Sequence, residues 1–519
     1  MAKDKNDRTY PGWMHRLGMA RTHRPQIGGI QPREMLRVWA VAVYGLLIVA
    51  IVAVFVPSIR NPIVCQTQWW CRHGLTEVSV AGRTEYVGVS GVYPFRPDFR
   101  HAMDVLEREN AYATKDGPGT YVTVALAGPL SGDEPRMLHR IEGAIAGQHD
   151  ANHSGLAGNL PRIRLVLANM DSGEGHWKLV ADRLVEMVHS DDRLVAVAGM
   201  GLSQAETVNA MNEVRALHVA TVGDIITADT INHQTYPPFS RVGPDTGQQL
   251  DVLGQHLGPR LAGHKAMLVV FSKRTDMYTS ALNADFQQYL GGPWQAGGKV
   301  IAPFGGNPGN EFPQIVRILC GTRGIDTVYY AGRAADLPLF LTNLDNRPGC
   351  APGAITVVST SDTTRMLVPT AANRRAWQAL RNNERPIDLI YTPLADPMFL
   401  AGRAESRQPM AALRGLFDNL GFARADLDTG WAIMGHDAVL TIAQATRTAS
   451  GNAGNIPPPQ SVADQLSLMS TSTTATLGAS GPIRLDRATG DRHDLRIPVL
   501  RFVPGGRPQV LDVYTPKHP

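Results

Sequence analysis

From residue 121 onward, short apolar runs alternate with stretches in which apolar residues recur at helical spacing. The run 194–198 is uninterrupted, as in a parallel strand that is buried on both faces. It leads into two glycines and Ser203, and a helical pattern follows over 204–217. Strands that alternate with helices predict right-handed crossovers and a parallel sheet. These units are too numerous for one compact sheet, so we expect an α/β fold with two doubly wound parallel-sheet lobes.

The same pattern gives the expected elements. Strands are expected at 121–127, 163–168, 194–198, 219–222, 266–271, 298–302, 327–331 and 354–359. Helices are expected at 135–153, 177–188, 204–217, 245–257, 278–290, 312–319, 337–345, 410–420 and 431–446. Strand-like segments close the chain at 483–485, 499–503 and 510–513, and two short strands and a helix precede residue 118, at 77–80, 85–89 and 98–113.

The N-terminal part differs from the rest in charge. Residues 1–37 contain eight Lys or Arg against three Asp or Glu, a charge of +5, so the remaining chain carries −1 of the total of +4. No basic domain is left to hold nucleic acid, and no such partner is expected. We predict that residues 1–37 form a mostly disordered basic tail.

Residues 38–56 run without a charge. At about 1.5 Å per residue, a helix of this length comes close to spanning the ~30 Å hydrocarbon core of a bilayer. A buried core helix and a cleaved signal peptide are the alternatives, but the run has no polar face and no small-residue cleavage site follows it. We therefore predict one transmembrane signal anchor over 38–57, with residues 1–37 cytoplasmic and the C-terminal domain extracytoplasmic.

The four cysteines suit an oxidising compartment. Cys65 and Cys71 bracket five residues, and Cys320 and Cys350 each close a helical segment in neighbouring βα units. Neither pair has CxxC spacing and no histidine cluster accompanies them, so disulfides are favoured over a metal site. We predict two local disulfides, no metal ligand and no cofactor.

Six short segments stand in order over roughly 390 residues: 127–132 (AGPLSG), 201–205 (GLSQA), 239–245 (FSRVGPD), 328–332 (VYYAG), 435–439 (GHDAV) and 478–486 (GASGPIRLD). In this order and spacing they resemble the type I periplasmic binding proteins, specifically the branched-chain amino-acid-binding branch of ABC-transporter substrate-binding proteins. The resemblance covers about 121–513 and leaves out residues 1–118.

The resemblance implies two lobes joined by three hinge strands, which close on a small ligand. Lobe one would take 119–247 and return at about 398–485. Lobe two would take 248–397 and about 486–519. Residues 58–118 are expected to form a small disulfide-closed linker element outside both lobes.

The resemblance assigns the main contact of lobe one to Ser203. In the family, a serine at this position and backbone amides near it hold the carboxylate of the ligand, and N–H groups at a helix start favour an anion. The alternative is that Ser203 caps the helix that follows, and one serine can do both. Residues 221–227 stand at the family's second carboxylate-binding loop, which adds Gly223, Asp224 and Thr227 as candidates. The Asp224 carboxylate would repel a ligand carboxylate unless it points away or meets a cation.

In lobe two the resemblance assigns Tyr278 and Asp336. Tyr278 stands where the family often has a tyrosine at a helix start, which closes over the ligand or simply packs. Asp336, seven residues after Tyr329, matches the acidic position that accepts the ammonium group of the ligand. Its alternative is an N-cap for the helix at 337–345. With Ser203 opposite, the cleft would fit a zwitterion.

Two enzyme interpretations are less favoured. Residues 201–205 approach the G-x-S-x-G elbow of α/β-hydrolases, with His436-Asp437 or His493 as partners of Ser203. However, Ala205 replaces the last glycine, and no HGGG-type oxyanion motif occurs. The glycine-rich stretch 305–309 lacks the Lys-Ser/Thr of a phosphate loop. No enzymatic activity is expected.

The sequence therefore predicts a membrane-anchored, extracytoplasmic solute-binding protein that holds a small polar, amino acid-like ligand by hinge closure. Its partner would be an ABC permease for uptake or a membrane signalling protein. The alternatives are an interaction or sensor protein with a degenerate cleft and, less favoured, a hydrolase that uses Ser203.

Overall fold

The computed structural model describes residues 74–155, 158–273, 275–347, 350, 353–451 and 454–517. The predicted basic tail, the anchor at 38–57 and the Cys65–Cys71 disulfide lie outside these residues. No helix within the described ranges is both long and apolar enough to cross a membrane.

The first seven-stranded sheet defines lobe one. Its strands follow the order β1 (Leu75–Val80), β2 (Arg83–Ser90), β4 (Arg162–Asn169), β3 (Tyr121–Gly128), β5 (Leu194–Ala198), β6 (Ala220–Gly223) and β7 (Phe239–Arg241). The strands from β4 to β7 are parallel, as the alternation of strands and helices predicted. In contrast, β1 and β2 pair antiparallel, and β2 pairs antiparallel to β4.

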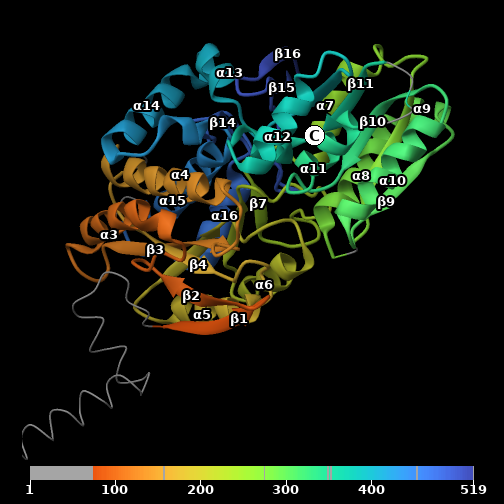
Figure 1. Cartoon of the computed structure of the whole chain (residues 1–519). Helices are drawn as coiled ribbons and strands as arrows, with labels where there is room; N and C mark the ends of the chain where they lie inside the picture. Colours follow the sequence, from red (N-terminus) through yellow and green to blue (C-terminus); the bar gives the residue numbers. More distant parts are fainter. Residues whose placement is uncertain are drawn as a thin grey trace, which may run out of the picture. The chain divides into compact units, whose positions relative to one another are not determined.

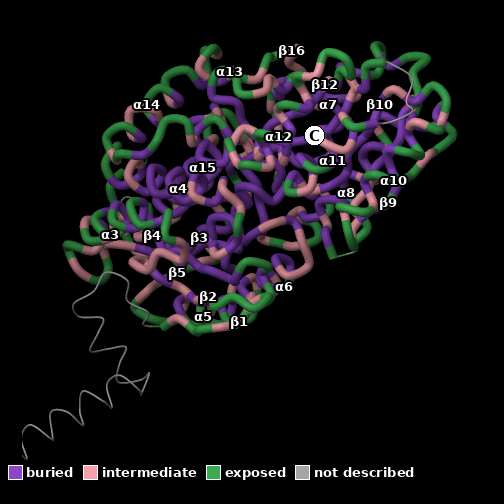
Figure 2. Tube along the Cα trace, in the orientation of Figure 1, coloured by how far each residue is buried: buried purple, intermediate pink, exposed green. Residues whose placement is uncertain are grey.

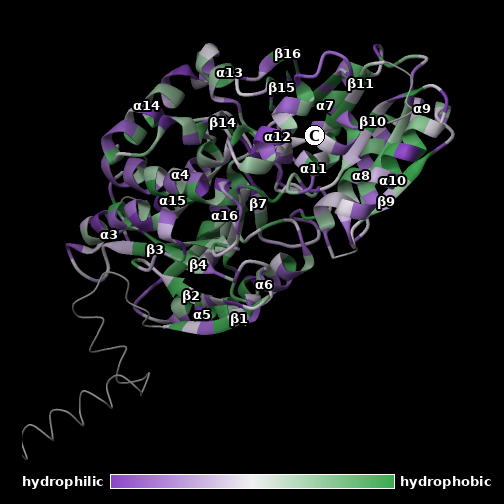
Figure 3. Ribbon diagram, viewed as in Figure 1, coloured by the Kyte–Doolittle hydropathy of each residue, from purple (hydrophilic) through white to green (hydrophobic). Residues whose placement is uncertain are grey.

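Helices cover both faces of this sheet. One face packs against α3 (Arg100–Thr114), α4 (Arg136–His153), α14 (Ala404–Leu420), α15 (Trp431–Ser450) and α16 (Pro459–Leu468). The other face packs against α5 (Trp177–His189) and α6 (Ala205–Arg215). With helices on both sides, β3 is buried over its whole length after Tyr121, which explains its continuous apolar run. The parallel strands of this sheet are accordingly mostly buried in Figure 2 and largely hydrophobic in Figure 3, whereas the edge strand β1 is exposed or half-buried.

The second seven-stranded sheet defines lobe two. Its strands follow the order β16 (Gln509–Tyr514), β15 (Ile497–Arg501), β12 (Ile387–Tyr391), β11 (Ile355–Ser359), β10 (Ile325–Ala331), β8 (Lys265–Phe271) and β9 (Ile301–Phe304). One face carries α7 (Thr246–Leu257), α8 (Met277–Tyr289) and α9 (Gly291–Ala296). The other carries α10 (Pro308–Gly321), α11 (Leu337–Asp345) and α12 (Ala371–Leu380).

The chain passes between the two sheets three times. It leaves lobe one between β7 and α7, and returns between β12 and α13 (Pro397–Gly402). It crosses again between the small hairpin β13–β14 (Thr476–Gly478 and Gly481–Ile483) and β15. Consequently lobe one contains the N-terminal helices and the C-terminal helices side by side, which appear as orange and blue ribbons in Figure 1.

The contact between α4 and α15 is very close. A Cβ at Gly143 or Gly147 of α4 would collide with the backbone of α15, and one at Gly435 of α15 would collide with that of α4. Glycine at these positions lets the two backbones approach directly. The two helices therefore form one packed unit, although about 290 residues separate them.

The prediction for residues 58–118 was wrong for the described part. The hairpin β1–β2 extends the sheet of lobe one, and α3 packs on α4 within the same hydrophobic core. The segment is therefore part of lobe one and not a separate linker. In lobe two, the predicted disulfide between Cys320 and Cys350 is confirmed, with Cα atoms 4.6 Å apart.

Candidate functional site: the cleft between the lobes

A cleft of about 320 Å³ lies between the two lobes. Lobe one contributes Leu202, Gln204 and Thr227 from the ends of its parallel strands, and Trp431 from the start of α15. Lobe two contributes charged residues that follow its own strands, among them Lys273, Arg333, Asp336 and Asp362. The carboxyl ends of parallel strands are where ligands bind in sheets of this kind.

Arg136, the first residue of α4, lines the cleft. Its Nη2 lies 2.5 Å from Oδ1 of Asp362 in lobe two, and its Nη1 donates to the Asp362 carbonyl at 2.9 Å. Glu134 accepts from Nε of Arg136 at 2.9 Å and also from Nε of Arg365 at 3.0 Å. Burial alone would raise the pKa of Asp362, but Arg136 and Arg333 hold it below its ordinary value. These ion pairs join the two lobes directly.

A second cation, the half-buried Arg333, follows β10. It makes a bidentate pair with Asp276, at 2.8 and 3.0 Å, and its Nη2 donates to the carbonyl of Ser203 in lobe one at 3.1 Å. Its guanidinium lies 4.7 Å from the ring centre of Tyr278. Backbone hydrogen bonds also cross between the lobes, from Tyr278 N to the Ser203 carbonyl and from Ala205 N to the carbonyl of Thr275, both at 3.1 Å.

The predicted residues of lobe two both line the cleft. Tyr278 is buried, and its hydroxyl lies 2.7 Å from Oγ1 of Thr360. Asp336 precedes α11 as the N-cap residue, yet its side chain makes no capping bond. Burial raises the pKa of Asp336, Arg365 opposes that rise, and Glu311 adds to it. A raised pKa is expected for a carboxylate that lacks a close neutralising partner.

Ser203 has a role that neither sequence interpretation anticipated. Its hydroxyl oxygen accepts the amides of Thr227 and Ala228, at 2.9 and 3.1 Å, and its side chain is not among those that line the cleft. The helix that follows, α6, takes Gln204 as its N-cap residue, so Ser203 does not cap it. Ser203 instead ties the loop after β5 to the loop after β6, and Ile225 and Thr227 of that second loop line the cleft.

Asp224 points away from the cleft. Its carboxylate forms a fully buried pair with Arg140 of α4, at 2.5 and 3.1 Å, and accepts the amide of Ile225. Gly223 ends β6 and packs on Phe239, and it does not line the cleft either. The expected repulsion between Asp224 and a ligand carboxylate therefore does not arise.

The sequence interpretation missed the charged network. Arg136 and Asp362 stand 226 residues apart, so no local pattern links them. The only signal was that Glu134, Arg136 and Arg333 stand in or near the connections that follow predicted strands, where polar groups of a binding site gather.

The residues proposed for a hydrolase do not assemble around Ser203. His436 lies 2.8 Å from Asp437 and 3.5 Å from Asp150, inside the packing of α4 and α15. The other candidate, His493, lies 3.2 Å from the carbonyl of Ser470 and 3.1 Å from Asp494. Neither histidine has a hydrogen bond to Ser203 in the described ranges, so no nucleophile–base pair is present there.

Comparison with known proteins identifies the architecture. No protein-family model and no curated protein sequence matches the chain. Solved structures do match. A substrate-binding protein of an ABC transporter from Desulfitobacterium hafniense, in complex with leucine, has 18% identity and a TM-score of 0.54, covering 75% of this chain and all of its own.

Two further structures agree. A leucine-binding protein from Thermotoga maritima has 16% identity and a TM-score of 0.56, covering 76% of this chain and 99% of its own. A solute-binding protein of an ABC transporter from Rhodopseudomonas palustris, in complex with p-hydroxybenzoic acid, has 14% identity and a TM-score of 0.57, covering 76% of this chain and 97% of its own. The chain therefore has the two-lobed fold of the type I periplasmic binding proteins, the fold of ABC-transporter substrate-binding proteins.

Proposed function

We propose that this chain is an extracytoplasmic solute-binding protein that holds a small, amino acid-like ligand between its lobes by hinge closure. The cleft between the two parallel sheets carries the proposal. Its volume of about 320 Å³ is at the small end of the roughly 300–1,000 Å³ range of ligand pockets. The similar structures with bound leucine or hydroxybenzoic acid support a small ligand of this class.

The charged side chains that line the cleft indicate which class of ligand it would bind. Arg136 and Arg333 are already neutralised by acidic side chains, as described above. The side chains of Asp336 and Lys273 make no hydrogen bond or ion pair that the described residues provide. A ligand ammonium group would meet Asp336, and a ligand carboxylate would meet Lys273 at the more exposed side of the cleft. A zwitterion offers both groups, and in this arrangement Lys273 takes the role first expected of Ser203.

A thermal-shift screen of the full chain tests this proposal. Each amino acid is compared with the matching acid that lacks the amino group. We expect stabilisation by at least one amino acid, and loss of more than tenfold in affinity with Asp336→Asn, because a desolvated charge pair contributes several kcal/mol. Asp326→Asn, an exposed position in the same lobe, serves as the control. Equal affinity of the amino acid for the wild type and for Asp336→Asn would remove the role of Asp336.

The predicted anchor over 38–57 would keep the lobes at the outer face of the membrane, where they would serve an ABC permease or a signalling partner. Membrane extraction tests the anchor: the full chain should stay in the membrane after salt and carbonate washes and leave it only with detergent. Release by salt alone would contradict it.

A second candidate function is favoured by one observation. The ion pair of Arg136 with Asp362 and the hydrogen bond from Arg333 to the Ser203 carbonyl cross the cleft and hold the lobes together. Such a cleft suits an interaction or sensor protein that has lost its ligand. If no compound in the screen stabilises the chain, this second function replaces the first.

A further inference from the structure

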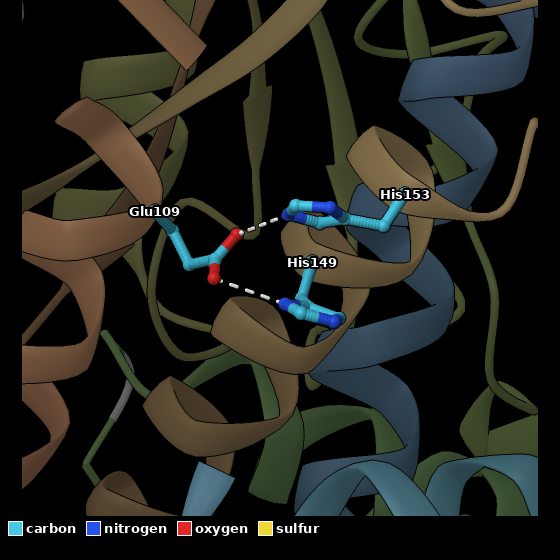
Figure 4. A group of neighbouring side chains, drawn as sticks. All are labelled: Glu109, His149 and His153. Carbon is cyan, nitrogen blue, oxygen red and sulfur yellow. Dashed lines mark hydrogen bonds and ion pairs between the residues drawn. The ribbon is translucent and has the colours of Figure 1, made fainter. Parts of the chain in front are cut away.

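A second group of ionisable side chains, one carboxylate and two imidazoles, lies outside the cleft, where α3 packs on α4. Glu109 of α3 faces His149 and His153 of α4, as Figure 4 shows. Oε1 of Glu109 lies 2.9 Å from Nδ1 of His149, and Oε2 lies 3.1 Å from Nε2 of His153. One ligand atom from each of the three residues lies within 4.8 Å of the other two.

The spacing explains why these side chains converge. His149 and His153 are four residues apart, so their rings project from the same face of α4, one turn apart. The rings stack, with centroids 4.3 Å apart, and Tyr112 of α3 stacks on the outer ring of His153 at 4.1 Å. The third side chain comes from another helix and approaches both rings from the same side. The facing atoms are therefore held in place before any ligand arrives.

We propose that Glu109, His149 and His153 form a binding site for a divalent transition-metal ion, with Zn²⁺ as the best match. Two imidazole nitrogens and one carboxylate are a ligand set that Zn²⁺ favours, with a water molecule in the fourth position. An ion bound there would need Nδ1 of His149 and Nε2 of His153 without a proton, so a neutral ring would carry its proton on the other nitrogen and a charged ring would release one proton to solvent.

The solvent exposure of the three side chains and the charges around them are consistent with a metal site. Glu109 is 8% exposed, whereas the side chains of His149 and His153 are 26% and 33% exposed, so an ion can enter from solvent. Asp150, beside His149, is engaged with His436 at 3.5 Å and supplies negative charge nearby without being a ligand. Lys115 and Arg162 lie over the Tyr112 ring at 4.1 and 5.2 Å, and these two nearby cations would weaken binding.

The sequence analysis missed this site because its search for a metal centre was based on the cysteines. The two histidines stand within a predicted helix, and Glu109 stands 40 residues before the first of them. Only the packing of α3 on α4, which the sequence did not predict, brings the three together. A bound ion would fasten α3 to the core of lobe one.

Titration calorimetry of the full chain with Zn²⁺, together with the visible absorption of bound Co²⁺, tests the site. We expect one binding event that is weakened at least tenfold by His149→Ala, His153→Ala or Glu109→Gln, the usual range for changes around a metal. The bound ion should also raise the melting temperature of the wild type but not that of the variants.

His264→Ala is the matched control, since His264 also pairs with a carboxylate, Asp326 at 2.7 Å, but no third ligand joins them among the described residues. It should leave the binding event unchanged. Glu109→Gln keeps the size of the side chain and tests the site even where a histidine variant folds poorly. Equal Zn²⁺ binding by the wild type and by the His149→Ala/His153→Ala double variant would overturn the proposal, as would the absence of a Co²⁺ spectrum from the wild type.

Discussion

At the scale of single residues, Arg140 and Asp224 show how lobe one keeps charge inside its core. Both side chains are fully buried, and two hydrogen bonds join them. Gly199 makes room for the pair, because a Cβ at that position would collide with both side chains, and its φ of +59° suits glycine. Removal of one partner from such a pair leaves the other charge buried without compensation.

We expect Asp224→Asn to lower the free energy of unfolding by about 3–5 kcal/mol, since Arg140 would lose its neutralising charge. Urea denaturation of the full chain, followed by circular dichroism, measures the change. Asp418→Asn is the control, because the Arg424–Asp418 pair has the same chemistry on an exposed surface. The control should have almost no effect. A loss of similar size in both variants would contradict the special role of the buried pair.

The residues of the candidate site also show which of its features could be predicted from the sequence. Tyr278, Thr227 and Asp336 were expected near the ligand, and all three line the cleft. That expectation came from the resemblance to the binding-protein family, which assigned these positions to the ligand. The partners of Asp224 and Asp362 could not be predicted, because Arg140 and Arg136 are distant in sequence and meet them only through tertiary packing.

At the scale of elements, a carboxylate supports the turn between β5 and α6. Glu174 is fully buried beneath this turn, and accepts the amide of Leu202 at 2.9 Å and the hydroxyl of Thr207 at 2.5 Å. Gly201, with φ of +136°, lies so close that a Cβ would collide with the carboxylate. Burial raises the pKa of Glu174 to about 7, while the hydrogen bonds oppose that rise.

This raised pKa predicts a dependence of stability on pH. The folded state binds the proton of Glu174 more tightly than the unfolded state, whose pKa is about 4.5. The contribution is therefore complete below pH 4.5 and is lost as the pH rises to 7 and beyond, by about 3 kcal/mol. Urea denaturation of the wild type and of Glu174→Gln at pH 5 and pH 8 measures it. The variant should lose less stability between the two pH values, and parallel curves would contradict the assignment.

Most elements were predictable, because a strand buried on both faces must be apolar along its length, as in β3 and β5. The omissions have physical reasons too. Strand β7 has only three residues and ends in Arg241, whose charge is paired with Asp491 inside the fold. Strand β12 is interrupted by Asp388, which pairs with Arg501 on the neighbouring antiparallel strand. In both strands, an oppositely charged residue that is distant in the sequence neutralises the charged side chain.

At the scale of the whole molecule, ion pairs hold the two lobes in contact. The pairs of Arg136 with Asp362 and of Glu134 with Arg365 lie across the cleft, beside the hydrogen bond from Arg333 to the Ser203 carbonyl. The amides of Ala205 and Tyr278 are protected only while the lobes touch, since their acceptors belong to the opposite lobe. These amides therefore report closure directly.

We expect Asp362→Asn to increase the hydrogen exchange of the Ala205 and Tyr278 amides by about tenfold or more, because the buried Arg136 would lose one of its two acidic partners. Mass spectrometry of the full chain measures the exchange in peptides that contain these residues. Asp388→Asn is the control, since the Arg501–Asp388 pair lies entirely within lobe two. Unchanged exchange in both variants would show that the ion pairs do not hold the lobes together.

The ion pairs across the cleft also affect the rates at which a solute could bind and dissociate. The pair of Arg136 with Asp362 spans the cleft that Asp336 lines, so the lobes can separate only when this pair breaks. The frequency of these separations sets how often the cleft can widen to admit a solute or to release one. The residence time of a bound solute would thus depend on the ion pairs of the chain itself. Asp362→Asn would shorten this residence time and also the time before a solute enters the cleft.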